Sequence, residues 1–227
     1  MRIKTPINKE KIKNHMTYHG WAYVLVAVVA ALGWNLVYTV TAPRVPDEKR
    51  IDLYVLSSTT SSEIVDSFLK PLWEEYAPEM ESVSSVVIGT YDDYATPMQL
   101  SAYVAAGEGD IYFLTETYFK SLAGQGALLS LDELVENGAI DASGVDLVKG
   151  YVTYISEYDE NDTPIGTDQH LYGIPLESFY GYMSGMQIDN RSLYAAILIN
   201  NRNDENVIPF FDVLLQAGRG EKPDWIE

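Results

Sequence analysis

The sequence predicts an α/β domain, with a mainly parallel sheet and helices on both of its faces, preceded by one transmembrane helix. Three observations predict this arrangement. An uncharged run of 22 residues lies near the N-terminus, short apolar runs alternate with amphipathic segments after residue 50, and 47% of the 227 residues are hydrophobic, which is enough for a packed core. Alternation of this kind favours parallel strands joined by helical crossovers.

The uncharged run covers residues 21–42 and contains one strongly polar side chain, Asn35. A helix of that length measures roughly 33 Å, which is enough to cross a hydrocarbon core of about 30 Å. Five basic residues precede it, so the positive-inside rule places residues 1–20 in the cytoplasm as a basic stub and the main domain outside. We therefore expect a single-pass protein of the cell membrane, with an extracytoplasmic domain.

Two other interpretations of this run stay open. A cleaved signal peptide would use the small residues 40–42, although the length of the run and Pro43 favour an uncleaved anchor. A buried helix of a soluble protein is the second, and 22 uncharged residues are long for such a helix. Residues 43–50 carry two prolines and a charge cluster, which predicts a short linker. The folded domain is then expected over residues 51–227.

The sequence of the first half of this domain predicts three strands separated by two helices. Residues 51–56 are a mostly apolar strand, and the apolar positions of residues 64–73 repeat at helical spacing after a polar turn. β-Branched residues predict a second strand over 83–89. Thr96 and Pro97 predict the start of a helix that continues to residue 106, before a third strand over 110–114.

The second half is less regular. A helix is expected from Glu116 to about residues 124–126, and a short one from residue 131 to 135. Candidate strands over 151–156 and 171–176 flank an acidic turn at 158–168 and are expected to form a hairpin or paired ends. Residues 193–199 are either a strand or a buried helix, and residues 206–216 close the domain as a helix.

Charge and composition exclude several functional classes. The first 42 residues carry a net charge of +4, whereas the remaining 185 hold 10 cations and 32 anions. A surface that negative repels phosphate backbones, so we expect no nucleic-acid partner. The chain has no cysteine, which excludes disulfides and thiolate metal sites, and it lacks the G-x-S-x-G, P-loop and H-E-x-x-H motifs. We therefore expect a protein that is not an enzyme.

Neither a metal site nor a cofactor site is predicted. His15 and His19 share an i, i+4 spacing in the basic stub, but two ligands are too few for the usual metal sites. The acidic residues 159–163 have oxygen ligands at alternate positions, as a calcium loop does. Pro164 stands where such a loop needs glycine, and His170 where it needs a bidentate glutamate, so a solvated turn is favoured.

Four segments of the domain resemble extracellular solute-binding proteins of ABC importers, particularly the sugar-binding type. The segments are the strand and helix of residues 51–76, the residues 98–114 with Ala-Ala-Gly-Glu-Gly-Asp before an apolar strand, the residues 122–134 with Gly-Ala-Leu-Leu-Ser-Leu-Asp-Glu-Leu, and the residues 170–176 with Tyr-Gly-Ile-Pro. They occur in the order that the family has. The resemblance implies a periplasmic-binding-protein-like fold.

The resemblance covers one lobe only. Members of the family have two lobes that close on a ligand, whereas only 51 residues follow residue 176 here, so we expect a single lobe. The family's lipid-bearing cysteine is also missing, and the transmembrane helix is expected to replace it. The partners that the resemblance implies are ABC permease subunits or another exported protein, and a small solute such as a sugar.

Candidate ligand-binding residues follow the predicted strands, because open α/β sheets bind ligands outside the carboxyl ends of their strands. Hydroxyls and carboxylates beside aromatic rings suit sugar recognition. For each candidate residue, the alternative to ligand binding is an ordinary role as a helix cap or a solvated surface side chain. The candidates are Ser57, Ser58, Thr59, Tyr91, Asp92, Thr115, Glu116, Tyr118, Glu177, Ser178 and Tyr180.

Two functions are compatible with a single lobe. The first is an accessory component of an import system that acts by protein contact, because an open lobe leaves one side of a ligand in water. The second is a receptor for a small solute, with weak binding on the open lobe or with a cleft completed by a second chain.

Overall fold

The computed structural model describes residues 9–41, 45–158, 164–200 and 202–220, and the chain divides into two compact units, residues 1–44 and 45–227. Helix α1 (Lys9–Thr41) belongs to the first unit. Its segment Gly20–Thr39 is long and apolar enough to cross a membrane, and none of that segment is buried. The exposure argues against the buried helix of a soluble protein, whereas a signal sequence has the same features. Residues 42–44 of the predicted span and linker lie outside the described residues.

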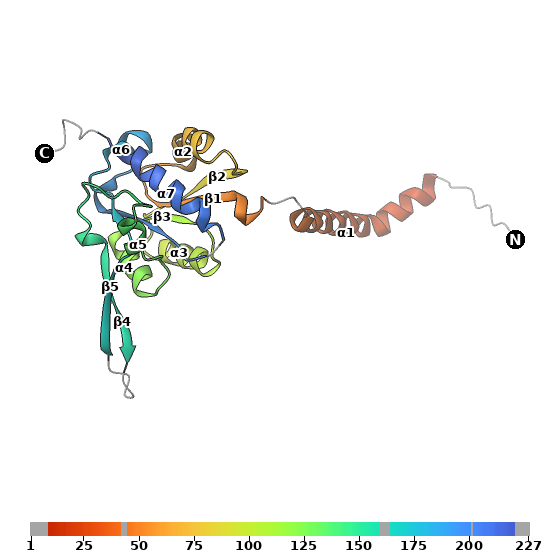
Figure 1. Cartoon of the computed structure of the whole chain (residues 1–227). Helices are drawn as coiled ribbons and strands as arrows, with labels where there is room; N and C mark the ends of the chain where they lie inside the picture. The colour runs from red at the N-terminus through yellow and green to blue at the C-terminus, as the bar shows by residue number, and fades with distance from the viewer. Residues whose placement is uncertain (1–8, 42–44, 159–163, 201, 221–227) are drawn as a thin grey trace. The chain divides into compact units, whose positions relative to one another are not determined.

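The second unit, whose helices surround a central sheet in Figure 1, is built around five strands in the order β2-β1-β3-β7-β6. Strand β1 pairs in parallel with β2 and β3, and β7 is antiparallel to both β3 and β6, so four of the five strands run in one direction. This confirms the mainly parallel sheet and assigns residues 193–197 to a strand. The bounds are β1 Arg50–Leu56, β2 Ser82–Ile88, β3 Ile111–Thr115, β6 Ile174–Pro175 and β7 Leu193–Ile197.

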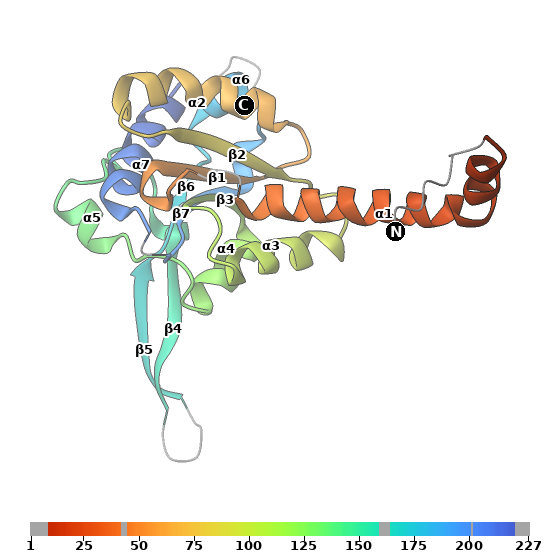
Figure 2. The ribbon, with the colours of Figure 1, turned by 90° about the vertical axis from the view of Figure 1, so that its right-hand side faces the viewer.

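Helices cover both faces of this sheet (Figure 2). Side chains of β1 alternate between two separate cores: Leu53 and Val55 belong to one, and Tyr54 and Leu56 to the other. The first core is closed by α2 Ser62–Tyr76, α5 Asp132–Glu136, α6 Tyr180–Gly185 and α7 Asp204–Gly218, and the second by α3 Ala95–Ala105 and α4 Glu116–Gly124. Burial of apolar side chains on both faces explains why β3 and β7 are nearly continuous apolar runs.

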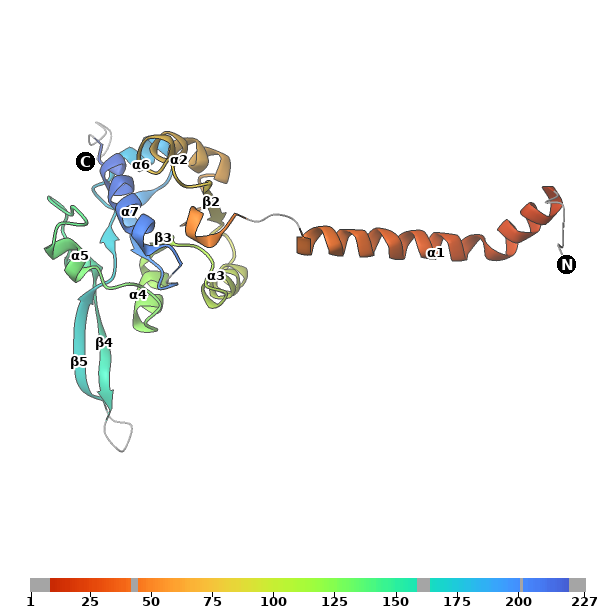
Figure 3. The same cartoon turned by 45° about the vertical axis from the view of Figure 1, so that its right-hand side comes forward.

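The hairpin differs from the prediction. Strand β4 (Tyr151–Tyr158) pairs with β5 (Pro164–Leu171) as a separate two-stranded sheet, which projects from the rest of the unit (Figure 3). The expected turn at 158–168 is therefore strand from Pro164 onward, and residues 159–163 lie outside the described residues. Thr153, Thr167 and Gln169 are exposed, whereas Leu171 at the end of β5 is buried in the core. The polar run of residues 166–170 lacks the alternation that predicts a strand, so most of β5 was expected as a turn. Residues 174–175 join the main sheet instead.

The two edge strands of the main sheet are protected in different ways. On β2, the backbone N–H of Ser85 donates to Asp66 Oδ1 at 2.8 Å and that of Val87 donates to Ser62 Oγ at 3.3 Å, so side chains of α2 occupy donors that a foreign strand would need. The opposite edge strand, β6, has two residues, and one of them is Pro175. A short strand containing proline offers little for edge-to-edge pairing.

A cluster of charged side chains lies at the amino end of the sheet, where the chain enters β1. Asp110 is 2% exposed; its carboxylate accepts the backbone N–H of Asp52 and the Asn200 amide, both at 2.8 Å. Arg202 approaches the same carboxylate at 3.5 Å. Burial raises the pKa of Asp110, and these hydrogen bonds oppose the rise. We call Asp47, Arg50, Asp52, Asp110, Asn200 and Arg202 the amino-end cluster.

Candidate functional site

The sheet brings all the predicted site residues to its carboxyl end. Leu56 of β1 is level with Ile88 of β2, and Pro175 of β6 and Thr115 of β3 pair with the first two residues of β7. The loops that follow β1, β2, β3 and β6 therefore open at the same end, opposite the amino-end cluster. This end is the candidate site.

After β1, the hydroxyl groups bind neighbouring protein atoms. Ser57 Oγ lies 3.1 Å from Thr59 Oγ1 and accepts the Thr59 backbone N–H. The Thr59 hydroxyl donates to the carbonyl of Gln187 at 2.8 Å, which joins this loop to the segment after α6. Gln187 has a φ of 56°, a conformation that is uncommon outside glycine. Ser57 and Thr59 thus position loops.

After β2, Asp92 caps helix α3. Its carboxylate accepts the backbone N–H groups of Ala95 at 2.9 Å and Tyr94 at 2.8 Å, and these bonds lower the pKa of Asp92. The helix consequently starts at Ala95, before the predicted start at Thr96. The Thr96 hydroxyl instead donates to the carbonyl of Gly89 at 2.7 Å. The capping alternative explains Asp92.

Tyr91 is different, because its ring is exposed and held in place. The hydroxyl donates to the carbonyl of Ser58 at 2.5 Å, and the ring lies close to Gly89, where an added Cβ would be 3.1 Å from a ring carbon. Even so, Tyr91 is 81% exposed. Ser58 therefore contributes its backbone carbonyl, which holds Tyr91. The exposed ring of Tyr91 is available to a partner.

After β3, the candidates occupy the start of helix α4. Thr115 is the last residue of β3 and precedes the helix. Glu116 pairs with Lys120 at 2.5 Å, and this hydrogen bond lowers the pKa of Glu116. Tyr118 packs against the core under α3 and α4. Glu116 is therefore an exposed charge, and Tyr118 is mainly structural.

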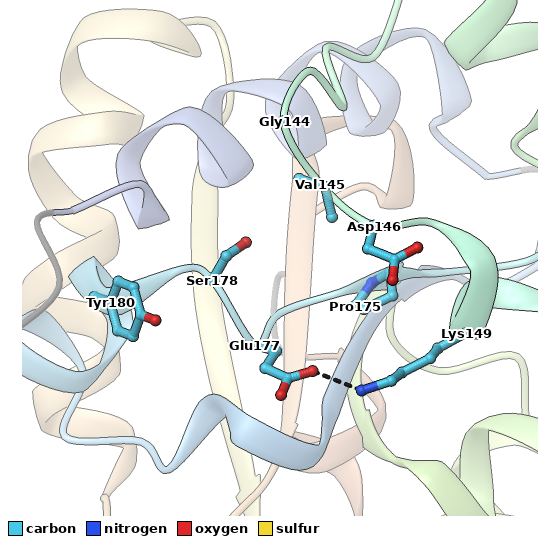
Figure 4. Close-up of a pocket in the computed structure, with 8 residues that line it drawn as sticks. All are labelled: Gly144, Val145, Asp146, Lys149, Pro175, Glu177, Ser178 and Tyr180. Atoms are coloured by element: carbon cyan, nitrogen blue, oxygen red, sulfur yellow. Dashed lines mark hydrogen bonds and ion pairs between the residues drawn. The ribbon is translucent and has the colours of Figure 1, made fainter. Parts of the chain in front are cut away.

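After β6, three candidates line one pocket (Figure 4). Glu177 accepts a hydrogen bond from Lys149 Nζ at 2.7 Å, which raises the pKa of Lys149. The two side chains remain 60% and 57% exposed. The pocket has a volume of about 250 Å³ and is lined by Gly144, Val145, Asp146, Lys149, Pro175, Glu177, Ser178 and Tyr180.

Three residues at this end escaped the sequence prediction. Lys149 and Asp146 come from the segment before β4 and share the pocket with Glu177. Tyr194, on β7, stacks on Phe119 with ring centroids 4.5 Å apart. Burial raises the pKa of Tyr194, and Glu116 adds to the rise. No local sequence pattern predicts that these residues lie at the carboxyl end. Lys149 precedes Glu177 by 28 positions, and Tyr194 is brought there by the antiparallel strand β7.

The described residues contain no group of three or more histidine, cysteine, aspartate or glutamate side chains that could hold a metal ion. His170 of β5 instead lies 2.8 Å from Asp132 at the start of α5. Asp132 also accepts the backbone N–H of Leu171 and the hydroxyl of Ser130. Burial acts to raise the pKa of Asp132, but the bonds from Ser130 and His170 outweigh it and the pKa is lowered.

Comparison with known proteins finds similarity among solved structures only. No protein-family model matches the chain, and no curated protein matches it. An extracellular solute-binding protein family 1 member from Alicyclobacillus acidocaldarius is 22% identical, with a TM-score of 0.40 over 56% of this chain and 27% of that one. An ABC substrate-binding protein from Listeria monocytogenes, in complex with cycloalternan, is 20% identical with a TM-score of 0.38 over 55% and 28%.

An N-glycan transport solute-binding protein from Streptococcus pneumoniae is 19% identical, with a TM-score of 0.35 over 56% of this chain and 24% of that one. These structures are of the kind that the sequence resembles. The matched part of this chain corresponds to about a quarter of each.

Proposed function

We propose that the chain is a membrane-anchored, extracytoplasmic lobe that serves an ABC-type import system as an accessory component, through contact with another protein. In this proposal α1 is the anchor and residues 1–20 lie in the cytoplasm. The lobe takes part through the carboxyl end of its sheet. ABC permease subunits and another exported protein are the candidate partners. The proposal includes no catalytic step and no cofactor.

The observation that carries the proposal is the openness of the carboxyl end. The pocket of about 250 Å³ is smaller than the 300–1,000 Å³ typical of small-molecule sites, and Lys149 and Glu177 beside it are more than half exposed. Ser57, Thr59 and Asp92 are occupied by bonds within the protein. An end of this kind leaves a small ligand poorly enclosed but offers a surface to a macromolecule.

A second candidate function is weak binding of a small solute such as a sugar. The specific observation in its favour is that Lys149, Glu177, Ser178 and Tyr180 meet around one pocket. Charged, hydroxyl and aromatic groups there could orient a polar molecule, and a second chain could complete the cleft. This function differs from the first in requiring affinity for a free solute.

The membrane arrangement is tested by thiol labelling, because the natural chain has no cysteine. Two single-cysteine variants, Lys13→Cys and Glu79→Cys, are expressed in cells and treated with a membrane-impermeant maleimide. We expect labelling of the Glu79 variant in intact cells and of the Lys13 variant only after lysis. Labelling of both in intact cells, or release of the Glu79 variant into the medium without α1, contradicts the anchored arrangement.

Contact through the carboxyl end is tested with a photo-crosslinking amino acid in the full-length chain. Thr117 is exposed at the carboxyl end, and Glu79 is an exposed position at the amino end. We expect a discrete crosslinked partner from Thr117 and none of the same mass from Glu79. Equal crosslinking from both positions would argue against a defined surface. Calorimetry of the full chain in detergent with a panel of sugars and uncharged peptides tests the second function, and micromolar binding of one of these solutes would favour it.

A further inference from the structure

The exposed ring of Tyr91 is held more firmly than its exposure requires. A surface tyrosine normally has rotational freedom, whereas this one is held by a hydrogen bond to Ser58 and by the close approach of Gly89. Gly89 and Ser58 belong to the loops after β2 and β1, so the ring bridges two loops at the carboxyl end. The outer face of the Tyr91 ring packs against neither core and caps no helix. A fixed aromatic ring contributes contact area at low entropic cost.

Two further large side chains close to Tyr91 in the sequence are exposed. Tyr94 and Met98 are 76% and 59% exposed, and their i, i+4 spacing at the start of α3 places them on one side of the helix. Asp92 and Asp93 lie in the same turn. We call residues 91–98 the tyrosine turn.

The charge of the lobe indicates what this turn attracts. Within the described part of the lobe, every lysine and arginine pairs with a carboxylate of the same chain: Lys49, Arg50, Lys70, Lys120, Lys149, Arg191, Arg202 and Arg219. Asp93 forms no ion pair among the described residues. The field outside the tyrosine turn is therefore set by surplus carboxylates, which attract a cation and repel an anion.

We propose that the tyrosine turn binds a basic polypeptide segment of the partner, with an arginine or lysine side chain on the outer face of Tyr91 and its charge near Asp93. The inference rests on the proposed function, because it gives the chemistry of the protein that contacts the carboxyl end. A cation over an aromatic face gains from the ring quadrupole, and a neighbouring carboxylate adds to that gain. A neutral ligand could still donate hydrogen bonds to these carboxylates, but only a cation gains from the long-range attraction of their surplus charge.

The probe is a short labelled peptide of alternating arginine and leucine, compared with the same peptide carrying citrulline, the uncharged isostere of arginine. Binding to the full chain in phosphatidylcholine nanodiscs is followed by fluorescence anisotropy. We expect binding of the arginine peptide that weakens as salt is raised. Each of Tyr91→Ala and Asp93→Asn should weaken it roughly 2- to 5-fold. Equal binding of the citrulline peptide overturns the proposal.

Tyr76→Ala is the matched control, because Tyr76 is also exposed beside carboxylates but lies near the C-terminus of α2. It should leave peptide binding unchanged, and a loss equal to that of Tyr91→Ala overturns the proposal. Tyr91→Phe keeps the ring and removes the bond to Ser58, so a loss smaller than that of Tyr91→Ala supports a positioned ring. Displacement of the peptide by maltotriose would make the turn a carbohydrate surface and overturn the basic partner. If Thr117 still crosslinks to a partner after any of these failures, the proposed function stands without this inference.

Discussion

The two ends of the sheet use the same kinds of side chain for different purposes. At the amino end, Asp110 and Arg202 are largely buried, and the carboxylate of Asp110 has three partners. At the carboxyl end, Lys149 and Glu177 form a shorter ion pair of 2.7 Å but remain more than half exposed. A short distance is therefore a poor guide to the contribution of an ion pair, because burial determines what is lost when one partner is removed.

The difference also separates stability from function. The amino-end cluster holds the start of β1 and the segment after β7 together, so its charges are used within the fold. At the carboxyl end, charged and aromatic side chains are carried by short loops and remain exposed to water. Variants at the first end should affect unfolding, and variants at the second should affect binding.

The largest effect is expected from Asp110→Ala. The substitution leaves Arg202 and the backbone N–H of Asp52 without their buried acceptor, which costs about 3–5 kcal/mol. Chemical denaturation of the full chain in detergent, followed by circular dichroism, measures it. Glu177→Ala, which breaks the shorter but exposed pair, should change stability little. Comparable destabilisation by the two variants would show that the ends do not differ as described.

Two glycines provide the same substitution at opposite ends. Gly109 has a φ of +80°, and an added Cβ would be 2.4 Å from the buried ring of Tyr54, so Gly109→Ala should cost roughly 2–4 kcal/mol. At Gly89 the added Cβ meets only the exposed ring of Tyr91 at 3.1 Å. Gly89→Ala should move that ring and weaken peptide binding with little change in denaturation midpoint. A large stability loss at Gly89 would contradict this.

Asp66→Ala tests the outer edge of β2 between the two ends, because the carboxylate of Asp66, on α2, binds Ser85 in the middle of that strand. It removes the acceptor for the backbone N–H and the hydroxyl of Ser85, which costs about 1–3 kcal/mol. The freed donor should also permit edge pairing and concentration-dependent association. Denaturation and light scattering measure the two effects. Ser67→Ala, on the exposed side of α2, is the control. A variant that stays monomeric and fully stable would remove the edge-protection role.

The smallest effect concerns pH. The pKa of Asp132 is lowered in the folded state, so its ionised form contributes stability that is present above the unfolded pKa of about 3.9 and is lost as pH falls through the folded value. Asp132→Asn should therefore lower the free energy of unfolding near neutral pH. The further loss of stability below about pH 4 should be smaller than in the natural chain. Denaturation at a series of pH values measures this. An unchanged acid slope would indicate that the bonds of Asp132 to His170 and Ser130 add nothing.

Much of the fold follows from local pattern. The apolar runs of β1 and β3 and the helical spacing of α2 and α7 identify those elements, because both faces of the sheet are covered and the buried surface is continuous in sequence. The hairpin was only partly predicted, since the polar residues 166–170 of β5 lack a strand period and pair with β4 outside the main sheet.

The end of the sheet at which the candidate residues lie could be predicted from the sequence, whereas their contacts could not. Parallel strands place their following loops at one end whatever the loop residues are, so Tyr91, Glu116 and Glu177 could be assigned to it. The sequence could not distinguish Asp92 as a helix cap from Tyr91 as an exposed ring, because both lie in one polar turn.

The sequence alone determined the uncharged N-terminal run, the excess of carboxylates and the alternation of strands and helices, since each depends on residues that are neighbours in the chain. Tertiary structure decided which charges are buried, which rings stay exposed, and that Lys149 meets Glu177. These depend on contacts between distant segments, and the free energy of a charge or ring is determined by how much water those contacts remove.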